Sequence, residues 1–256
     1  MSFRQELIHE MIPVPRATET MSQRKATVTL PEGVSLDRVG QILLDAWEGG
    51  MRPRKSGLPK LQDGDAGTTP IPRDAPELFR LLFERRVPYL LVGGIAMLTY
   101  LEGRNTKDVD LLISLEAARQ IPELEIEDAN DFFARAQFRS IRVDLLLTGN
   151  PLFKIVAQSY ATRRRFSELD VPAVTVEGLI VLKLYALPSL YRQMDMDRVA
   201  LYENDITMLL ARHSPKVEPL LALVEKHVET GDVKELRKIF TECTERARRL
   251  RERAGA

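Results

Sequence analysis

The sequence has 256 residues, of which 44% are hydrophobic, so it suits one large domain or a domain with an appendage. Its 37 basic and 37 acidic residues cancel, which disfavours a globally cationic nucleic-acid binder, although a local basic patch remains compatible. The single cysteine, Cys243, excludes an internal disulfide, and no apolar run approaches the ~20 residues of a membrane span. The N-terminus lacks the apolar core of a signal peptide, so we expect a cytoplasmic protein without a membrane partner.

The first part of the chain is expected to be an appendage followed by a linker. Residues 26–30 alternate threonine with apolar side chains and favour a short strand, and Ser35 suits the N-cap of a helix that reaches about Trp47. Residues 52–76 hold five prolines and three glycines, a composition typical of a flexible linker. The predicted organisation is an N-terminal appendage at 1–51, a linker at 52–74, a core at 75–176 and a helical region at 177–256.

Residues 89–114 are the stretch on which the functional interpretation depends. An apolar run at Tyr89–Val92 has the length of a buried strand, and the glycines Gly93 and Gly94 follow it directly. A short helix is expected next, at residues 95–101. This order predicts a tight turn in front of a helix N-terminus, where backbone N–H groups and the helix dipole favour a phosphate.

The next predicted strand, Asp108–Ile113, carries two aspartates at alternate positions. Because alternate residues of a strand share a face, Asp108 and Asp110 should point the same way while Val109 and Leu111 point into the core. Two crowded carboxylates repel each other and lose hydration, which is costly unless a cation lies between them. A bare Asp-x-Asp is more often a solvated strand end, but the glycine pair ahead of it favours the cation.

Further elements are predicted around these two strands. Residues 75–86 suit a helix with Pro76 in its first turn, and residues 115–120 suit a short one. Residues 123–131 are strongly acidic, so an exposed loop is expected there. Residues 133–147 then become strand-like.

The end of that strand-like region supplies a third carboxylate. Residues 141–145 alternate cleanly, which places Arg142 and Asp144 together on one face. An acid on a third strand is often only a surface position, but after the Asp-x-Asp it points to a shared site. Three carboxylates on neighbouring strands can hold one or two Mg²⁺ ions, or Mn²⁺, through oxygen ligands. Two such ions align the attacking and leaving oxygens of a phosphoryl transfer.

The C-terminal half is predicted to be helical. After a strand at 171–176, a helix is expected at 177–187, with Lys183 as its only cation and Pro188 at its end. Three more helices are expected at 197–212, 219–228 and 232–253. A helix, then mixed strands, then several helices predict an α+β or α/β fold, with a mixed β-sheet, flanking helices and a helical C-terminal half.

Over about residues 75–210 the sequence resembles the nucleotidyltransferase superfamily related to DNA polymerase beta. The resemblance rests on Gly93-Gly94, thirteen intervening residues, Asp108-Val109-Asp110 and the later Asp144. Within that superfamily the sequence is similar to the AbiEii-type toxins of type IV toxin–antitoxin systems. Their Arg-x-Thr-x-Asp-x-Asp run is matched by residues 104–110, and their Leu-x-x-Leu-Lys helix by residues 179–183.

The resemblance implies a role for each matched position. Gly93 and Gly94 would hold the triphosphate of a nucleotide, which Arg104 and Thr106 would also contact. Lys183 would contact a phosphate; the alternative is a solvated helix lysine. The catalytic and metal-binding residues would be the three acids: Asp108 and Asp110 would bind Mg²⁺, and Asp144 would complete the site and help to deprotonate the acceptor hydroxyl.

The implied activity is a Mg²⁺-dependent transfer of a nucleoside monophosphate from an NTP to a hydroxyl acceptor, by a toxin-like enzyme with a cognate antitoxin as a partner. Arginines at 135, 139, 142 and 163–165, with the basic last helix, favour tRNA or another RNA as the acceptor, while the neutral net charge supports the alternative that they are ordinary solvated charges. A protein or a small molecule such as an antibiotic is the alternative acceptor. A protein of another class, an inactive module that keeps only the fold and binds a partner, also remains open.

Overall fold

The computed structural model describes residues 71–101, 106, 108–166 and 169–255. All of these belong to the larger of two compact units, Gly33–Ala256. The predicted strand at 26–30, the predicted helix after Ser35 and the residue Arg104 lie outside the described residues. Within the described part of the chain, none of the helices combines the length and the apolar character that crossing a membrane requires.

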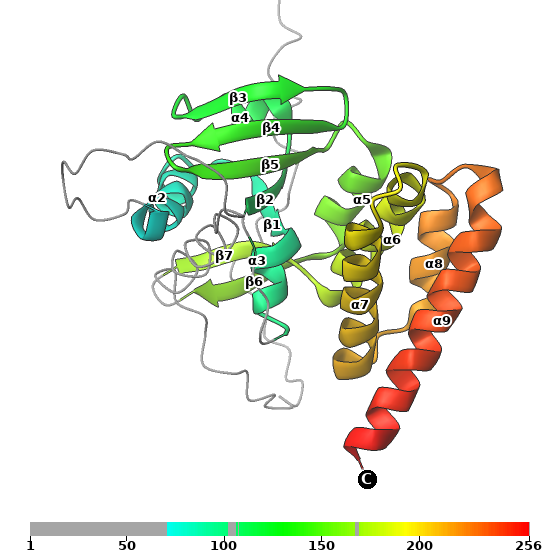
Figure 1. Ribbon diagram of the computed structural model, residues 1–256. Coiled ribbons are helices and arrows are strands. Elements are labelled where there is room, and N and C mark those ends of the chain that lie inside the picture. Colours follow the sequence, from blue (N-terminus) through cyan, green and yellow to red (C-terminus); the bar gives the residue numbers. More distant parts are fainter. Residues whose placement is uncertain (1–70, 102–105, 107, 167–168, 256) are drawn as a thin grey trace, which may run out of the picture. The chain divides into compact units, whose positions relative to one another are not determined.

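The described residues form one seven-stranded sheet in the order β3-β4-β5-β2-β1-β7-β6 (Figure 1). Its strands are β1 Tyr89–Val92, β2 Asp108–Ile113, β3 Leu124–Ala129, β4 Phe133–Phe138, β5 Ile141–Leu147, β6 Ala161–Phe166 and β7 Leu169–Val174. The pairs β2–β5 and β1–β7 are parallel, and the other neighbouring pairs are antiparallel. This mixed sheet, with the helices that follow it, confirms the predicted α+β fold class.

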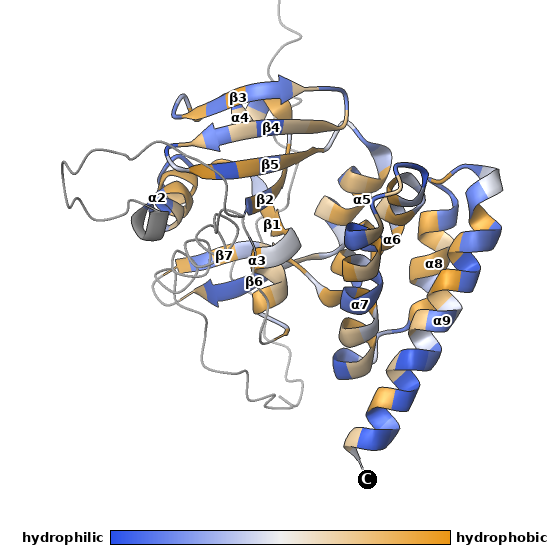
Figure 2. Cartoon of the chain, viewed as in Figure 1, coloured by the Kyte–Doolittle hydropathy of each residue, from blue (hydrophilic) through white to orange (hydrophobic). Residues whose placement is uncertain are grey.

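Helices precede, interrupt and follow the strands. They are α2 Ile71–Glu84, α3 Gly93–Leu98, α4 Leu115–Ala118, α5 Pro151–Ser159, α6 Val176–Arg192, α7 Met196–His213, α8 Val217–Glu225 and α9 Thr230–Ala254. The helix α6 packs on β7 and on the other three C-terminal helices, while α2 packs on β5 and α3 packs on β1 and β2. Figure 2 shows apolar residues interspersed with hydrophilic ones along α9, whose buried residues recur at helical spacing. These are Leu236, Ile239, Phe240, Cys243 and Ala247.

The two central strands have the bounds that the sequence predicts. All four residues of β1 are buried, because this strand lies inside the sheet with helices packed nearby. In β2, Val109 and Leu111 are fully buried whereas Asp108 and Asp110 are only partly buried. The alternation in β5 is as regular, with Arg142 and Asp144 on the more exposed face. The predicted placement of the acids on one face of these strands is therefore confirmed.

The prediction of an exposed acidic loop at 123–131 is wrong. Residues 124–129 form β3, an edge strand that pairs antiparallel with β4. Leu124 is buried and Ile126 packs against the core, while Glu125 and Glu127 are exposed. Acidic side chains are therefore compatible with a strand here, because an edge strand has a solvated face and charges on it also discourage pairing with other chains.

Other differences from the predictions concern two prolines that lie inside helices and two elements that were not predicted. Pro188 does not end α6, which continues to Arg192. Losing one backbone hydrogen bond at a proline costs ~3 kcal/mol, and burial of Leu187 and Leu190 offsets this cost because each buried leucine contributes about 1.5–3 kcal/mol. Likewise α2 begins before the predicted residue 75, so Pro76 lies inside it. The sequence also left α5 and β6 without a prediction.

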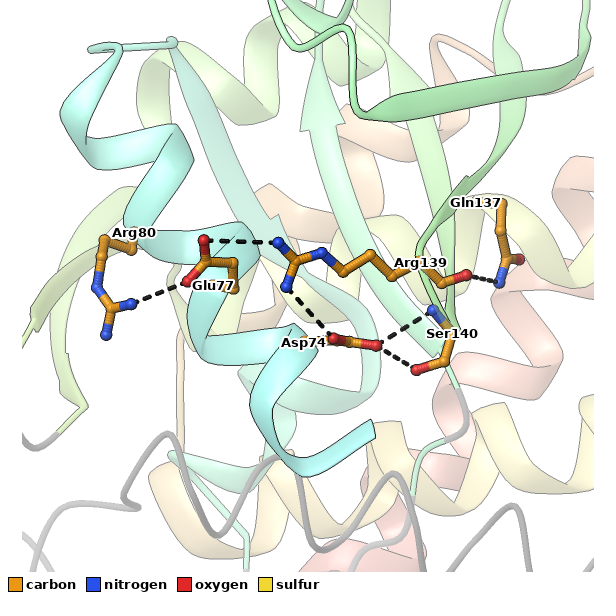
Figure 3. A network of polar contacts seen from close by, with 6 residues as sticks. All are labelled: Asp74, Glu77, Arg80, Gln137, Arg139 and Ser140. Carbon is orange, nitrogen blue, oxygen red and sulfur yellow. Dashed lines mark hydrogen bonds and ion pairs between the residues drawn. The ribbon is translucent and has the colours of Figure 1, made fainter. Parts of the chain in front are cut away.

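The strand-like region at 133–147 is a hairpin, and its turn is fixed to α2 by a polar network (Figure 3). Arg139 in the turn has a left-handed backbone conformation, with φ +51°. Asp74 of α2, only 3% exposed, accepts hydrogen bonds from the backbone N–H and the hydroxyl of Ser140 and lies 3.6 Å from the Arg139 guanidinium. Glu77 lies 3.7 Å from the same guanidinium. This network fixes the start of β5, the strand that carries Asp144.

Candidate active site

Strand register brings the three aspartates to adjacent positions. Asp110 on β2 lies opposite Asp144 on the parallel strand β5 and opposite Val92 on the antiparallel strand β1. Gly93 follows Val92 directly, so the glycine turn lies beside the acids. Asp108 is two residues before Asp110, on the same strand face. The residues that the sequence singled out on three separate segments therefore meet at one place on the sheet.

The glycine turn fits against the acids so closely that side chains are excluded from it. Gly93 has φ +61°, and a Cβ there would lie 1.9 Å from Oδ2 of Asp110. The backbone N–H of Gly94 donates a hydrogen bond of 3.2 Å to the same oxygen. A Cβ on Gly94 would lie 2.3 Å from Oγ1 of Thr106, whose hydroxyl donates to the carbonyl of Asp108. Gly93 is thus required by packing and by backbone conformation, and Gly94 by packing.

Asp110 is the acid whose ionisation is most perturbed. The pKa of its carboxyl group is raised to about 7, first by burial and then by the neighbouring negative charges of Asp144 and Asp108. The Gly94 N–H and the positive charge of Lys183 act in the opposite direction. A cation placed here would favour the ionised carboxylate, so the site is electrostatically suited to bind one.

Two arginines lie among the acids, a feature that sequence analysis had interpreted only as part of an RNA-facing surface. Arg142 forms an ion pair with Asp108, and its Nε atom lies 3.8 Å from Oδ1 of Asp144. Arg135 approaches the same oxygen at 3.7 Å. Arg142 lies opposite Asp108 and Arg135 lies opposite Asp144 in the strand register. The alternation of residues 141–145 in the sequence placed Arg142 on the same strand face as Asp144. Which aspartates the two arginines contact depends on the strand register, which the sequence does not give.

The donor set fits a hard divalent cation, although the side chains are not gathered around one. Carboxylate oxygens are the ligands that Mg²⁺ prefers. Among the described residues, however, no group of three or more His, Cys, Asp or Glu side chains is arranged to hold a metal ion. The Arg142 guanidinium supplies the positive charge between Asp108 and Asp144 instead. The Asp108 oxygen that Arg142 contacts, Oδ2, could therefore ligate a metal only after this ion pair opens.

Lys183 is buried rather than solvated, so the alternative of a solvated helix lysine is wrong. It is 5% exposed, and its Nζ atom lies 2.8 Å from the equally buried Asp205 and 4.1 Å from the ring centre of Tyr202. A buried ammonium group needs such partners, because removing it from water is otherwise costly. Asp205, to which sequence analysis assigned no role, is thus the residue that holds Lys183 in place.

A cleft of about 490 Å³ lies beside the acids, a volume in the range of small-molecule sites. Gly93, Asp110 and Lys183 contribute to its lining. Another part of the lining is aromatic and includes Phe133, Phe153 and Tyr185. The predicted residues Gly93, Asp110 and Lys183 therefore share one cleft, while Gly94, Thr106, Asp108 and Asp144 lie beside them.

No protein-family model matches the chain, and no curated protein matches it. Solved structures similar to it include two nucleotidyltransferase-like proteins and an antibiotic-resistance factor. An antigenic nucleotidyltransferase-like protein from Paracoccidioides brasiliensis is 14% identical with a TM-score of 0.40, covering 64% of this chain and 89% of its own. A proposed nucleotidyltransferase from Thermotoga maritima is 15% identical with a TM-score of 0.33. The match covers 50% of this chain and 94% of the Thermotoga chain. The antibiotic-resistance factor ANT(2'')-Ia is 16% identical with a TM-score of 0.38. The match covers 65% of this chain and 89% of the resistance factor.

Proposed function

We propose that this protein is a Mg²⁺-dependent nucleotidyltransferase that transfers a nucleoside monophosphate from an NTP to a hydroxyl acceptor. One observation carries the proposal: Asp110 and Asp144 lie opposite each other on parallel strands, beside a glycine turn that excludes side chains and at the edge of a cleft. Crowding three acids here is costly in a protein that binds no cation, and a metal-bound triphosphate would offset that cost.

Each residue of the site then has a role. Asp108, Asp110 and Asp144 would hold Mg²⁺ or Mn²⁺, which supplies charge neutralisation for the triphosphate. Asp144 takes the proton of the acceptor hydroxyl while the oxygen of that hydroxyl forms a bond to the α-phosphorus of the NTP. The bond from that phosphorus to the bridging oxygen breaks, and pyrophosphate leaves with the electron pair. Lys183, held by Asp205, contacts a phosphate in the cleft.

Exposed arginine side chains on the β4–β5 hairpin and on β6 support a polyanionic acceptor. Arg135 and Arg139 are 57% and 53% exposed, and Arg165 on β6 is 69% exposed. Exposed guanidinium groups bind phosphates well. We therefore favour tRNA or another RNA as the acceptor, and the role of a toxin-like enzyme with a cognate antitoxin in the cytoplasm. A protein or an antibiotic is the alternative acceptor.

A second candidate function is an inactive binding module with the same fold. The ion pair between Arg142 and Asp108 favours it, because the arginine already neutralises one of the acids. Calorimetric titration of the folded protein with Mg²⁺ and NTP separates the two candidates. Heat of binding is expected for the enzyme, and its absence would support the module.

Labelling tests the proposed activity directly. Wild-type protein incubated with each labelled NTP and total RNA or cell lysate should label one class of molecule. Asp110→Asn should label nothing, because the carboxylate next to the glycine turn is lost. Glu125→Gln is the matched control, since it removes an exposed acid from β3 of the same sheet, opposite Gln137, and should label as the wild type does. Equal labelling by Asp110→Asn would contradict the proposal.

A further inference from the structure

Strand β4 presents an aromatic and a cationic side chain next to Asp144. Phe133 lies opposite Leu146 and Arg135 lies opposite Asp144 in the β4–β5 register. Because Phe133 and Arg135 are two residues apart on one strand, their side chains share a face, and both are exposed. Phe133 also lines the cleft that contains Asp110. A molecule whose hydroxyl approaches Asp144 would therefore meet this pair of side chains.

The ring of Phe133 is held in place by its surroundings while remaining 46% exposed. It packs edge-on against the buried Phe153, with ring centres 5.4 Å apart, and Phe153 packs in the same way against Tyr185 at 5.6 Å. The side chain of Asn130 accepts a hydrogen bond from the Phe133 N–H, and the Asn130 N–H donates to the Phe133 carbonyl. An exposed aromatic ring on such a rigid support loses little conformational freedom when a ligand stacks on it.

Arg135 supplies the charge that complements such a ligand. Its guanidinium is 57% exposed, and only its Nε side approaches Asp144, at 3.7 Å. The planar guanidinium has five N–H donors in a fixed geometry that suits phosphate oxygens. An aromatic ring and a guanidinium on one strand face match a base and a phosphate, the two recognition elements of a nucleotide.

We propose that Phe133 and Arg135 form an acceptor subsite for the end of a single-stranded polynucleotide. Phe133 stacks on the terminal base, Arg135 binds the adjacent phosphate, and the terminal hydroxyl then lies beside Asp144. This inference rests on the proposed function and adds the residues that select the acceptor. Neither side chain takes part in the bond changes themselves: both position the hydroxyl that loses its proton to Asp144.

Binding of a fluorescently labelled single-stranded oligoribonucleotide to the full chain, measured by anisotropy, tests the subsite without requiring catalysis. Phe133→Ala should weaken binding by about tenfold, because the stacking of one base on an aromatic side chain is worth about 1–3 kcal/mol. Phe133→Trp should retain the affinity. Arg135→Gln should weaken binding and reduce the slope of log affinity against log salt by about one. Replacing the terminal base with an abasic sugar should remove the effect of Phe133→Ala.

Phe132 provides a matched control, because it is the neighbouring residue, is 43% exposed and is not part of the described cleft lining. Phe132→Ala should bind the oligoribonucleotide as the wild type does, and all variants should melt as the wild type does. Equal losses in Phe132→Ala and Phe133→Ala would overturn the subsite. So would a wild-type protein that labels a protein or a small molecule but binds no oligoribonucleotide, and in that case the proposed function stands. Binding that depends on Phe133, without labelling of any acceptor, would support the subsite and overturn the transferase.

Discussion

The β4–β5 hairpin carries two clusters of acids and arginines that differ in how completely their charges are balanced. The turn cluster consists of Asp74, Glu77, Arg80, Arg139 and Ser140, so its two acids are matched by two arginines (Figure 3). The strand cluster consists of Asp108, Asp110, Asp144, Arg135 and Arg142. In the turn cluster the buried acid receives two hydrogen bonds and a nearby guanidinium. In the strand cluster three acids face two arginines, and both contacts to Asp144 are long, at 3.7 and 3.8 Å.

This difference separates a cluster that holds the fold from one that is prepared to bind a ligand. A balanced cluster gains nothing from an added cation, whereas a cluster with excess negative charge does. The raised pKa of Asp110, caused first by burial, means that ionising this carboxyl group is unfavourable in the folded protein and that the neighbouring groups do not compensate fully. Mutations should therefore affect stability in the turn cluster and activity in the strand cluster.

The largest expected effect is on catalysis, in Asp144→Asn. Transfer should fall by about 10²–10⁴-fold, the usual contribution of a positioned proton acceptor. Binding of NTP should persist, because Asp108, Asp110 and the glycine turn remain. Comparing single-turnover transfer with equilibrium NTP binding checks this, and Glu125→Gln is again the control. A parallel loss of binding and transfer would mean that Asp144 serves mainly as a metal ligand.

The next largest effect is on stability, in Asp74→Ala. Removing this buried acid leaves the Ser140 donors without their acceptor and Arg139 with Glu77 as its remaining acidic contact, so the free energy of unfolding should fall by about 3 kcal/mol. Chemical denaturation measures the loss. Glu77→Ala, which removes a contact of 3.7 Å to the same arginine, should cost much less. If Asp74→Ala retained full stability but lost activity, the contrast between the two clusters would be wrong.

A smaller effect is expected on the pH dependence of stability, through Asp110. Because its pKa is raised in the folded protein to about 7, the folded state holds a proton that the unfolded state releases. Its contribution should therefore destabilise the protein progressively as the pH rises from about 4 to about 7, and then level off. Asp110→Asn should remove this slope and raise stability at pH 8. Denaturation measured across this pH range checks it, and an unchanged slope in the variant would contradict it.

The smallest effect is expected for Asp108→Asn without Mg²⁺. Relief of repulsion from the other acids is opposed by loss of the ion pair with Arg142, a contact in which both side chains are partly exposed. Such pairs contribute about 0–1 kcal/mol, so the melting temperature should change little. Differential scanning calorimetry of Asp108→Asn beside Asp110→Asn measures the difference. A gain as large as that of Asp110→Asn would show that Arg142 does not balance Asp108.

Sequence patterns predicted the strands that carry the acids because local information specifies them. The apolar run of β1 and the alternation of β2 and β5 each depend only on neighbouring residues. The acidic strand β3 was missed because its place at the sheet edge, where charge is tolerated, is set by tertiary structure. The pairing of Arg142 with Asp108, and of Lys183 with Asp205, depends on register and helix packing, which no local pattern contains. The site's residues were thus predictable, while the partners that control their charge were not.

The close packing of the glycine turn also has a consequence for how this protein can diverge. At position 93 any side chain would meet Asp110 itself, so glycine should persist there in every descendant that keeps the acid. At position 94 the obstacle is the side chain of Thr106, which is not one of the acids. Positions 94 and 106 should therefore evolve as a pair, with a side chain gained at 94 only in lineages where the one at 106 is lost or moves away.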